Sequence, residues 1–219
     1  MKSGSLIVLF LILFAGGAAA QDPPFYKDIQ NFKRMDSAAM PPKGAIVFTG
    51  SSSFTGWKDV QQRFPDYTII NRGFGGSSLP HVIMYADDVI FKYEPKQVVI
   101  YCGENDAAAG AQVTADTITN RFITLFNLIR GRLPDTDIAF VSMKPSPSRV
   151  KFRDVITKAN DRIKTFLEQH PKTAYIDVYS KMLDTNGAPI GTLFQSDSLH
   201  MTRPGYDIWT EAIGPYLKK

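Results

Sequence analysis

Five short apolar runs recur from Gly44 onwards, and longer segments of mixed polarity separate them. The runs lie at residues 45–48, 67–70, 98–101, 138–141 and 174–176. Within each run, apolar side chains follow one another instead of alternating with polar ones, which is typical of strands buried on both faces. The pattern therefore predicts the strands of a parallel sheet that helices cover on both sides.

Two of the longer segments repeat apolar residues at steps of three and four. The first holds Ile118, Phe122, Leu125, Phe126 and Ile129, and the second holds Phe152, Ile156, Ala159, Ile163 and Phe166. This spacing places each set on one face of a helix. Strands that alternate with amphipathic helices predict a doubly wound α/β domain, in which the loops after the strands carry the site.

The N-terminus has a different pattern. Lys2 precedes an apolar run from Leu6 to Phe14, and small residues follow up to Ala20. A positive start, an apolar stretch of roughly 7–15 residues and an A-x-A end predict a secretory signal peptide over residues 1–20, with export to the periplasm or outside the cell. The stretch is shorter than the ~20 residues that cross a bilayer, so no stable membrane insertion is expected after cleavage.

A lead-in segment at residues 21–43, with a short helix around Ile29–Met35, is expected to precede the main domain at residues 44–219. The chain carries 25 Lys+Arg against 21 Asp+Glu, and the two signs are interspersed, so we expect no nucleic-acid partner. Cys102 is the single cysteine, which excludes an intramolecular disulfide and a cysteine zinc cluster. We interpret it as a small buried residue.

Small and polar residues follow three of the apolar runs and precede the last helical segment. These stretches are residues 49–53, 71–77, 102–106 and 197–200. Because the carboxyl ends of parallel strands meet at one edge of a sheet, we expect the stretches to form one site.

The four stretches contain the groups that acyl transfer by a serine requires, namely a nucleophile, a base, a group that orients the base, and oxyanion donors. His200 is the candidate base, and Asp197 is placed to orient it. Ser51, Ser52 and Ser53 are alternative nucleophiles, and each of them is also a suitable helix N-cap.

Gly76 and Asn105 are the candidate oxyanion donors, although a turn glycine and an Asx-turn would explain them equally well. The other two histidines have structural explanations. His81 follows a proline near a helix start without a carboxylate nearby in sequence, and His170 lies at the end of a helix, where it can cap the last carbonyls.

Taken in order, these stretches resemble the sequence blocks of the SGNH (GDSL) hydrolase family over essentially the whole domain. Residues 48–53 read F-T-G-S-S-S and map the nucleophile to Ser52, although Ser51 stands where the family usually has Asp. Residues 103–106 match G-x-N-D, and residues 197–200 match D-x-x-H. The larger lipase elbow G-x-S-x-G is absent, and the Gly-rich stretch lacks the third glycine of a dinucleotide fingerprint.

The resemblance implies a flavodoxin-like three-layer α/β/α sandwich with a parallel five-stranded sheet. It also implies that the N–H groups of Ser52 and Gly76, with Gly75 as the one-residue alternative, and the Asn105 amide hold the oxyanion. Ser52 would then form an acyl-enzyme with His200 as the base.

For such a protein we expect hydrolysis of short-chain acyl or acetyl esters, on small molecules or carbohydrates, without a metal or organic cofactor. Two alternatives are a lysophospholipase-like lipid acylhydrolase and a non-catalytic ligand-binding domain on the same fold. Arg72 and Arg149 are either substrate contacts or solvated arginines, and the oligomeric state is left open.

Overall fold

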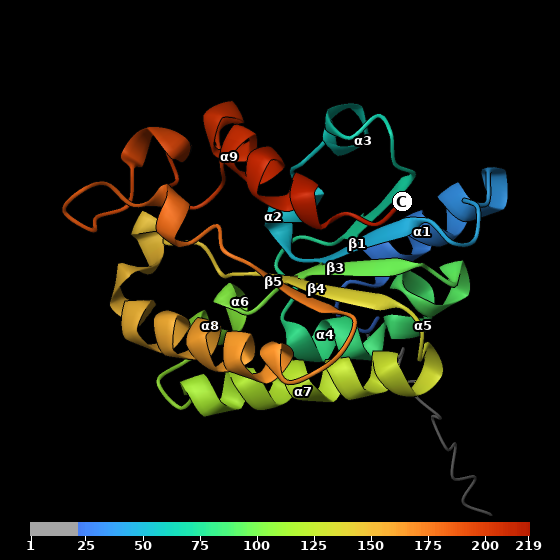
Figure 1. The fold of residues 1–219 in the computed structure, drawn as a ribbon, viewed down its shortest axis with the longest axis horizontal. Coiled ribbons are helices and arrows are strands. Elements are labelled where there is room, and N and C mark those ends of the chain that lie inside the picture. Colours follow the sequence, from blue (N-terminus) through green and yellow to red (C-terminus); the bar gives the residue numbers. More distant parts are fainter. Residues whose placement is uncertain (1–21) are drawn as a thin grey trace, which may run out of the picture.

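The computed structural model describes residues 22–219, so the predicted signal peptide at residues 1–20 lies outside the described residues. Parallel strands form a five-stranded sheet in the order β2-β1-β3-β4-β5 (Figure 1). The strands are β1 Ile46–Gly50, β2 Ile69–Gly73, β3 Gln97–Tyr101, β4 Asp137–Val141 and β5 Thr173–Ile176. The predicted doubly wound, flavodoxin-like sheet is confirmed.

Helices follow each strand. The α-helices are α1 Tyr26–Ala38, α2 Ser52–Thr55, α3 Val60–Arg63, α4 Leu79–Met84, α5 Ala86–Val89, α6 Glu104–Ala108, α7 Ala115–Arg132, α8 Arg153–Glu168 and α9 Arg203–Ile213. Short 3₁₀ helices are η1 Phe91–Tyr93, η2 Pro147–Phe152, η3 Ser180–Met182, η4 Gly191–Leu193 and η5 Gly214–Tyr216.

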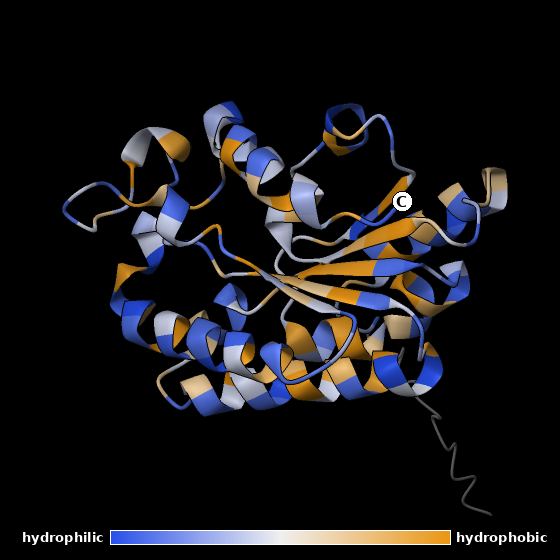
Figure 2. Ribbon diagram, viewed as in Figure 1, coloured by the Kyte–Doolittle hydropathy of each residue, from blue (hydrophilic) through white to orange (hydrophobic). Residues whose placement is uncertain are grey.

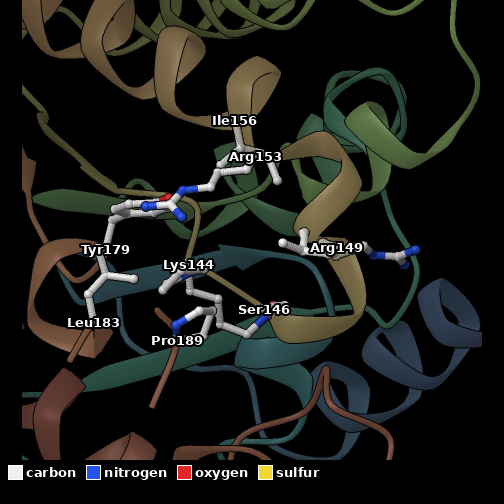
Figure 3. A pocket seen from close by; sticks show the side chains of 10 residues that line it. Lys144, Ser146, Arg149, Arg153, Ile156, Tyr179, Leu183 and Pro189 are labelled. Carbon is white, nitrogen blue, oxygen red and sulfur yellow. The ribbon is translucent and has the colours of Figure 1, made fainter. Parts of the chain in front are cut away.

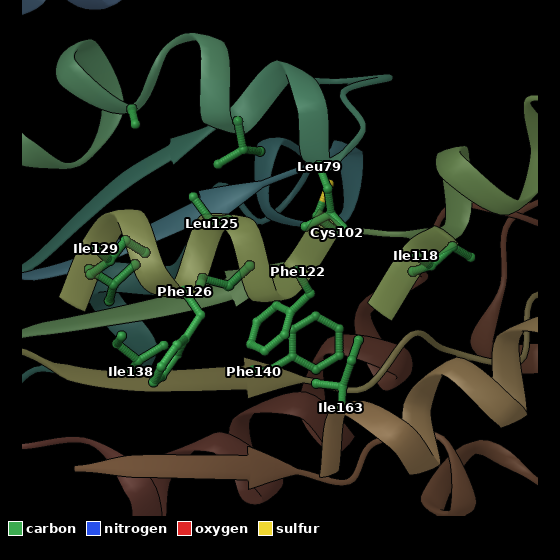
Figure 4. Packing of buried hydrophobic residues seen from close by; sticks show 14 of the residues in the cluster. Leu79, Cys102, Ile118, Phe122, Leu125, Phe126, Ile129, Ile138, Phe140 and Ile163 are labelled. Atoms are coloured by element: carbon green, nitrogen blue, oxygen red, sulfur yellow. The ribbon is translucent and has the colours of Figure 1, made fainter. Parts of the chain in front are cut away.

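The helices form a layer on each face of the sheet (Figure 1). On one face, α4, α5, α7 and α8 bury a core that includes Phe122 and Phe140, whose rings meet edge to face at 4.9 Å (Figure 4). On the other face, α2, α3 and α9 bury an aromatic core around Trp57 and Trp209. Both tryptophans are fully buried.

The two predicted amphipathic helices are α7 and α8. Each turns an apolar stripe toward the sheet and a polar stripe toward solvent (Figure 2). Phe152, the first residue of the second predicted stripe, ends η2 instead of starting α8. Within residues 22–219, none of the helices has the length and apolar character to cross a membrane.

Two element boundaries differ from the prediction. The helix expected at residues 29–35 is the longer α1, whose Ile29 and Phe32 pack into the core beside the sheet. Strand β2 starts later than the apolar run at 67–70 and continues through Arg72 to Gly73, because the backbone of these residues pairs with Thr49 and Gly50 of β1. The polar side chains there are hydrogen-bonded, since Asn71 donates to the Phe54 carbonyl at 2.7 Å and Arg72 pairs with Asp36.

Candidate active site

The carboxyl ends of the three strands that carry the first candidate residues lie side by side. Gly50 of β1 pairs with Gly73 of β2 and with Tyr101 of β3. Its φ is +131°, and a Cβ built on it would lie 1.9 Å from the Tyr101 carbonyl oxygen, so only glycine fits. The Ser51 N–H then donates to that carbonyl at 2.9 Å. The chain is thereby turned from β1 into α2.

The three candidate serines differ in accessibility. The side chains of Ser51 and Ser53 are buried, at 3% and 1% exposure, whereas Ser52 is half-buried. Ser51 is the N-cap residue of α2, but its side chain makes no capping hydrogen bond. Of the three hydroxyls, only that of Ser52 is therefore placed to meet a substrate.

The candidate oxyanion donors are held beside this turn. The Asn105 amide donates to the Ser77 carbonyl at 2.9 Å, and the Ser77 hydroxyl donates to the Gly50 carbonyl at 3.0 Å. One of the two Asn105 N–H donors is used in this way, which leaves the other for a ligand. A Cβ built on Gly75 would lie 3.8 Å from the Ser52 Cβ, so the glycine loop directly adjoins the serine.

Asp106, the last residue of G-x-N-D, fixes the spacing of these loops. It is fully buried, and it accepts hydrogen bonds from the Leu79 N–H at 3.0 Å and from Arg121 at 2.7 Å. Burial raises the pKa of the Asp106 carboxyl above its ordinary value, although these donors oppose the shift. Asp106 thus connects the start of α4, after the glycine loop, to α6, which carries Asn105.

Gly76 is exposed and has a φ of +84°. A Cβ built on it would lie 3.6 Å from the ring of Phe25, which precedes α1. The Phe25 ring also meets Phe74 and His81 edge to face, at 5.3 and 4.6 Å. Residues of the lead-in segment therefore form part of the wall beside the glycine loop, which the sequence pattern did not reveal.

The candidate base and its orienting carboxylate are hydrogen-bonded to each other. His200 Nδ1 lies 2.6 Å from Asp197 Oδ2, and Asp197 Oδ1 accepts the backbone N–H groups of Leu199 and His200, both at 2.9 Å. The His200 ring and these two N–H groups hold the pKa of the Asp197 carboxyl far below its usual range. A proton on Nδ1 directed at Asp197 leaves Nε2 free to accept one from a nucleophile.

One contact joins α9, which follows this turn, to α2, and a second contact joins the turn itself to η2. The Tyr206 hydroxyl of α9 donates to the Ser53 carbonyl of α2 at 2.9 Å, and the Ser148 N–H donates to the Ser198 carbonyl at 3.0 Å. Among the described residues, Ser52 and His200 share no direct hydrogen bond. Catalytic hydrogen bonds are often long in a ligand-free enzyme and shorten when substrate binds.

A comparison with known protein families tests the resemblance that the four sequence blocks suggest. Residues 38–208 match the model of the GDSL-like lipase/acylhydrolase family. The chain belongs to this family. The resemblance inferred from the sequence blocks is thereby confirmed.

Solved structures share the fold of this GDSL-like protein. A GDSL-like lipase from Bacteroides thetaiotaomicron is 23% identical, with a TM-score of 0.73, and the match covers 86% of this chain and 96% of that one. An acetylxylan esterase from Geobacillus stearothermophilus is 12% identical, with a TM-score of 0.61 over 78% and 93% of the two chains. A family 3 carbohydrate esterase from Clostridium thermocellum is 16% identical, with a TM-score of 0.58 over 78% and 95%. No curated protein matches the chain significantly.

The remaining histidines and the cysteine of this GDSL-like protein have structural contacts. His81 Nδ1 accepts the Ser78 N–H at 3.1 Å in a capping box, and burial lowers its pKa. His170 Nδ1 lies 2.7 Å from the Phe166 carbonyl in the last turn of α8, which is the capping role expected of it. Cys102 is fully buried, and burial raises the pKa of its thiol, as suits a core residue.

Arg72 is not available to a substrate. Its guanidinium is buried and donates to Asp36 and to the Tyr93 hydroxyl, both at 2.5 Å. It therefore attaches α1 to the edge strand. Arg149 is half-buried, and its guanidinium points away from the small pocket that its residue helps to line (Figure 3). Its contact with substrate stays a prediction.

A buried charged cluster beside Asn105 was not predicted from the sequence; it is formed by Glu104, Lys144, Ser146 and Tyr101. Its signal was a charged residue inside the G-x-N-D block and a lysine three residues after the end of an apolar strand. Within residues 22–219, no three His, Cys, Asp or Glu side chains are grouped to hold a metal ion.

Proposed function

We propose that this GDSL-like protein is an exported serine esterase that hydrolyses short-chain acyl esters, with acetylated carbohydrates as the favoured substrates. The observation that carries the proposal is that Ser52 is the one accessible serine of the three after β1. Helix α9, which follows the hydrogen-bonded Asp197–His200 pair, is itself bonded to the neighbouring residue Ser53. A serine, a histidine and a carboxylate in these roles form a catalytic triad.

In the proposed reaction, His200 Nε2 takes the Ser52 proton as the serine oxygen attacks the ester carbonyl carbon. The negative charge of Asp197 stabilises the imidazolium that forms, because its depressed pKa keeps the carboxylate ionised. His200 then gives the proton to the leaving alcohol oxygen. A water molecule, deprotonated by His200, then attacks the acyl carbon and releases the carboxylic acid, and His200 returns the proton to Ser52.

The tetrahedral oxyanion would be held by the N–H groups of Ser52 and Gly76 and by the Asn105 amide. Loss of one such donor typically costs about 10²–10³ in kcat. Hydrogen bonds connect the glycine loop to the end of β1, directly before the serine turn, and to α6, so the loops that carry the three donors are held together before the substrate arrives.

Two observations support the proposed substrate class: the solvent exposure of Asp197 and His200, and the solved structures that share the fold. The side chains of Asp197 and His200 are 47% and 40% exposed, which leaves room for a bulky alcohol such as a sugar. Two solved structures of this fold are an acetylxylan esterase and a carbohydrate esterase. Export is supported by the predicted signal peptide.

The test compares residues 21–219 with Ser52→Ala on nitrophenyl esters of increasing acyl length and on acetylated xylo-oligosaccharides. We expect an acetyl optimum that the variant loses completely. A long-chain optimum would instead support a lipid acylhydrolase. A folded wild type without activity on any of these esters would contradict the proposal and favour a ligand-binding domain. Activity that survives in Ser52→Ala would show that Ser52 is not the nucleophile.

A further inference from the structure

Glu104 places a buried carboxylate directly beside Asn105, and no step of the proposed reaction uses it. The side chains of Glu104 and Lys144 are only 4% and 1% exposed. Lys144 Nζ donates to Oε2 and the Ser146 hydroxyl donates to Oε1, both at 2.5 Å, and the Tyr101 hydroxyl also donates to Oε2. A buried charge is costly unless it is paired and hydrogen-bonded in this way.

On one side, this Glu104 cluster is connected to the nucleophile and to the oxyanion donor. Tyr101 is the last residue of β3, and its carbonyl accepts the N–H of Ser51 next to the nucleophile. Glu104 is the first residue of α6, so Asn105 is its direct neighbour in the same helical turn. A displaced Glu104 carboxylate would therefore displace the turn that carries Asn105.

On the other side, the cluster is connected to the base. Lys144 and Ser146 lie between β4 and η2, and Ser148 donates its N–H to the Ser198 carbonyl at 3.0 Å. Ser198 lies inside the turn that pairs His200 with its carboxylate, and it has a left-handed φ of +58°. Such a conformation persists only where its surroundings hold it.

We infer that Glu104 is a positioning residue of the active site, which fixes the oxyanion donor Asn105 relative to His200 through its hold on Lys144 and Ser146. This inference rests on the proposed function. Hydrogen bonds to a charged group are short and directional, so they define the relative position of two loops. Such definition matters because a misplacement of about 1 Å can cost about 10²-fold in rate.

A second buried carboxylate in the same chain provides a matched control. Asp36 is bonded to Arg72, Tyr93 and Lys92, and its side chain is 8% exposed. Asp36 lies in α1 and its partners lie in β2 and η1, and none of these side chains bonds to the turns of Ser52, Asn105 or His200. Glu104→Gln and Asp36→Asn each replace a buried carboxylate by an amide of the same shape.

The experiment measures kcat and KM on nitrophenyl acetate, and urea unfolding, for wild type, Ser52→Ala and these two variants. We expect Glu104→Gln to lower kcat by about tenfold to a hundredfold with KM changed by less than about threefold, since misplaced catalytic groups affect turnover. Asp36→Asn should unfold at lower urea concentration yet keep kcat within about twofold, because neither Asp36 nor its partner side chains bond to the turns of Ser52, Asn105 or His200.

A double-mutant cycle separates positioning from general stability. If Glu104 acts through Asn105, Asn105→Ala should cost much less in the Glu104→Gln background than in wild type. Where circular dichroism shows that Glu104→Gln does not fold, Ser146→Ala takes its place in the cycle, with an expected loss in kcat of about threefold to tenfold.

The outcomes are distinct. If turnover depends on Ser52, any of three results would overturn the inference. These are a wild-type kcat in folded Glu104→Gln, a kcat loss in Glu104→Gln no larger than that in Asp36→Asn, and an Asn105→Ala effect that is equally large in both backgrounds. Turnover that does not depend on Ser52 would overturn the proposed function and the positioning role together.

Discussion

Two ion pairs within residues 22–219 have both partners buried, Glu104–Lys144 and Asp36–Arg72. Their chemistry is alike, since each carboxylate also accepts a hydrogen bond from a buried tyrosine hydroxyl. Their positions differ. The first pair joins the loop after β3 to the loop after β4, whereas the second joins α1 to the edge strand β2.

Burial of an ion pair does not by itself indicate a role in function. The Asp36 pair, with the Arg72 guanidinium 5.1 Å from the centre of the Phe32 ring, attaches a peripheral helix. The Glu104 pair lies directly beside Asn105 and joins the loops that follow β3 and β4. What separates the two pairs is therefore which backbone segments they hold, and the variants below change one pair at a time.

The largest effect is expected from removal of the buried cation of the site. Lys144→Met leaves the Glu104 carboxylate without its charge partner, and breaking a buried pair in this way costs about 3–5 kcal/mol. Arg72→Met should cost less, because Asp36 keeps Lys92. Urea denaturation measures both losses, and a larger loss in Arg72→Met would contradict this ranking.

The next largest effect is a loss of kcat with only a small loss of stability. Asn105→Ala should lower kcat by about 10²–10³, or about 2.7–4 kcal/mol of transition-state stabilisation. Its free energy of unfolding should fall by only about 0.5–1.5 kcal/mol, because one hydrogen bond to Ser77 is lost. A near-wild-type kcat in this variant would remove Asn105 from the site.

A smaller effect is the pH dependence of the stability that the Asp36 pair contributes. Burial raises the pKa of Asp36, but hydrogen bonds from Lys92, Tyr93 and Arg72 outweigh it, and the pKa is lowered overall. A lowered pKa contributes stability above the unfolded value of about 3.9, and this contribution is lost as the pH falls through the folded value. The difference in unfolding free energy between wild type and Asp36→Asn should therefore shrink below about pH 4. A difference that stays constant from pH 6 to pH 2 would contradict this assignment.

The smallest effect on activity is expected from Arg72→Lys. Lysine keeps the charge but cannot donate to Asp36 and Tyr93 in the same forked geometry, so stability should fall by about 1–2 kcal/mol. Because Arg72 is buried away from the substrate, kcat/KM should stay within about twofold of wild type. A tenfold rise in KM would restore Arg72 as a substrate contact.

Much of the fold was predictable because the apolar runs and helical stripes report local burial. The Asp197–His200 pair was predictable too, since three residues separate its partners and a single turn joins them. Which of the three serines is the nucleophile could not be determined from the residue types alone. Three neighbours have the same side chain, and only their burial in the folded chain distinguishes Ser52.

The Glu104 cluster and the Phe25 contact were not predictable for a different reason. Glu104 and Lys144 meet because β3 and β4 are neighbours in the sheet, so their pairing depends on strand order and register. Phe25 reaches Gly76 because α1 packs beside the sheet, which its local sequence does not specify. Arg72 shows the converse, since a residue in a loop-like stretch proved to lie in a strand.

The most direct test of the catalytic assignment is to label the folded protein with a fluorophosphonate and to locate the adduct by mass spectrometry of its peptides. The probe reacts with a serine that a neighbouring base activates. We predict one adduct per chain, on Ser52, which is lost in Ser52→Ala and strongly slowed in His200→Ala. An adduct on Ser51 or Ser53, or labelling at the same rate without His200, would contradict the assignment of Ser52 as the nucleophile and His200 as its base.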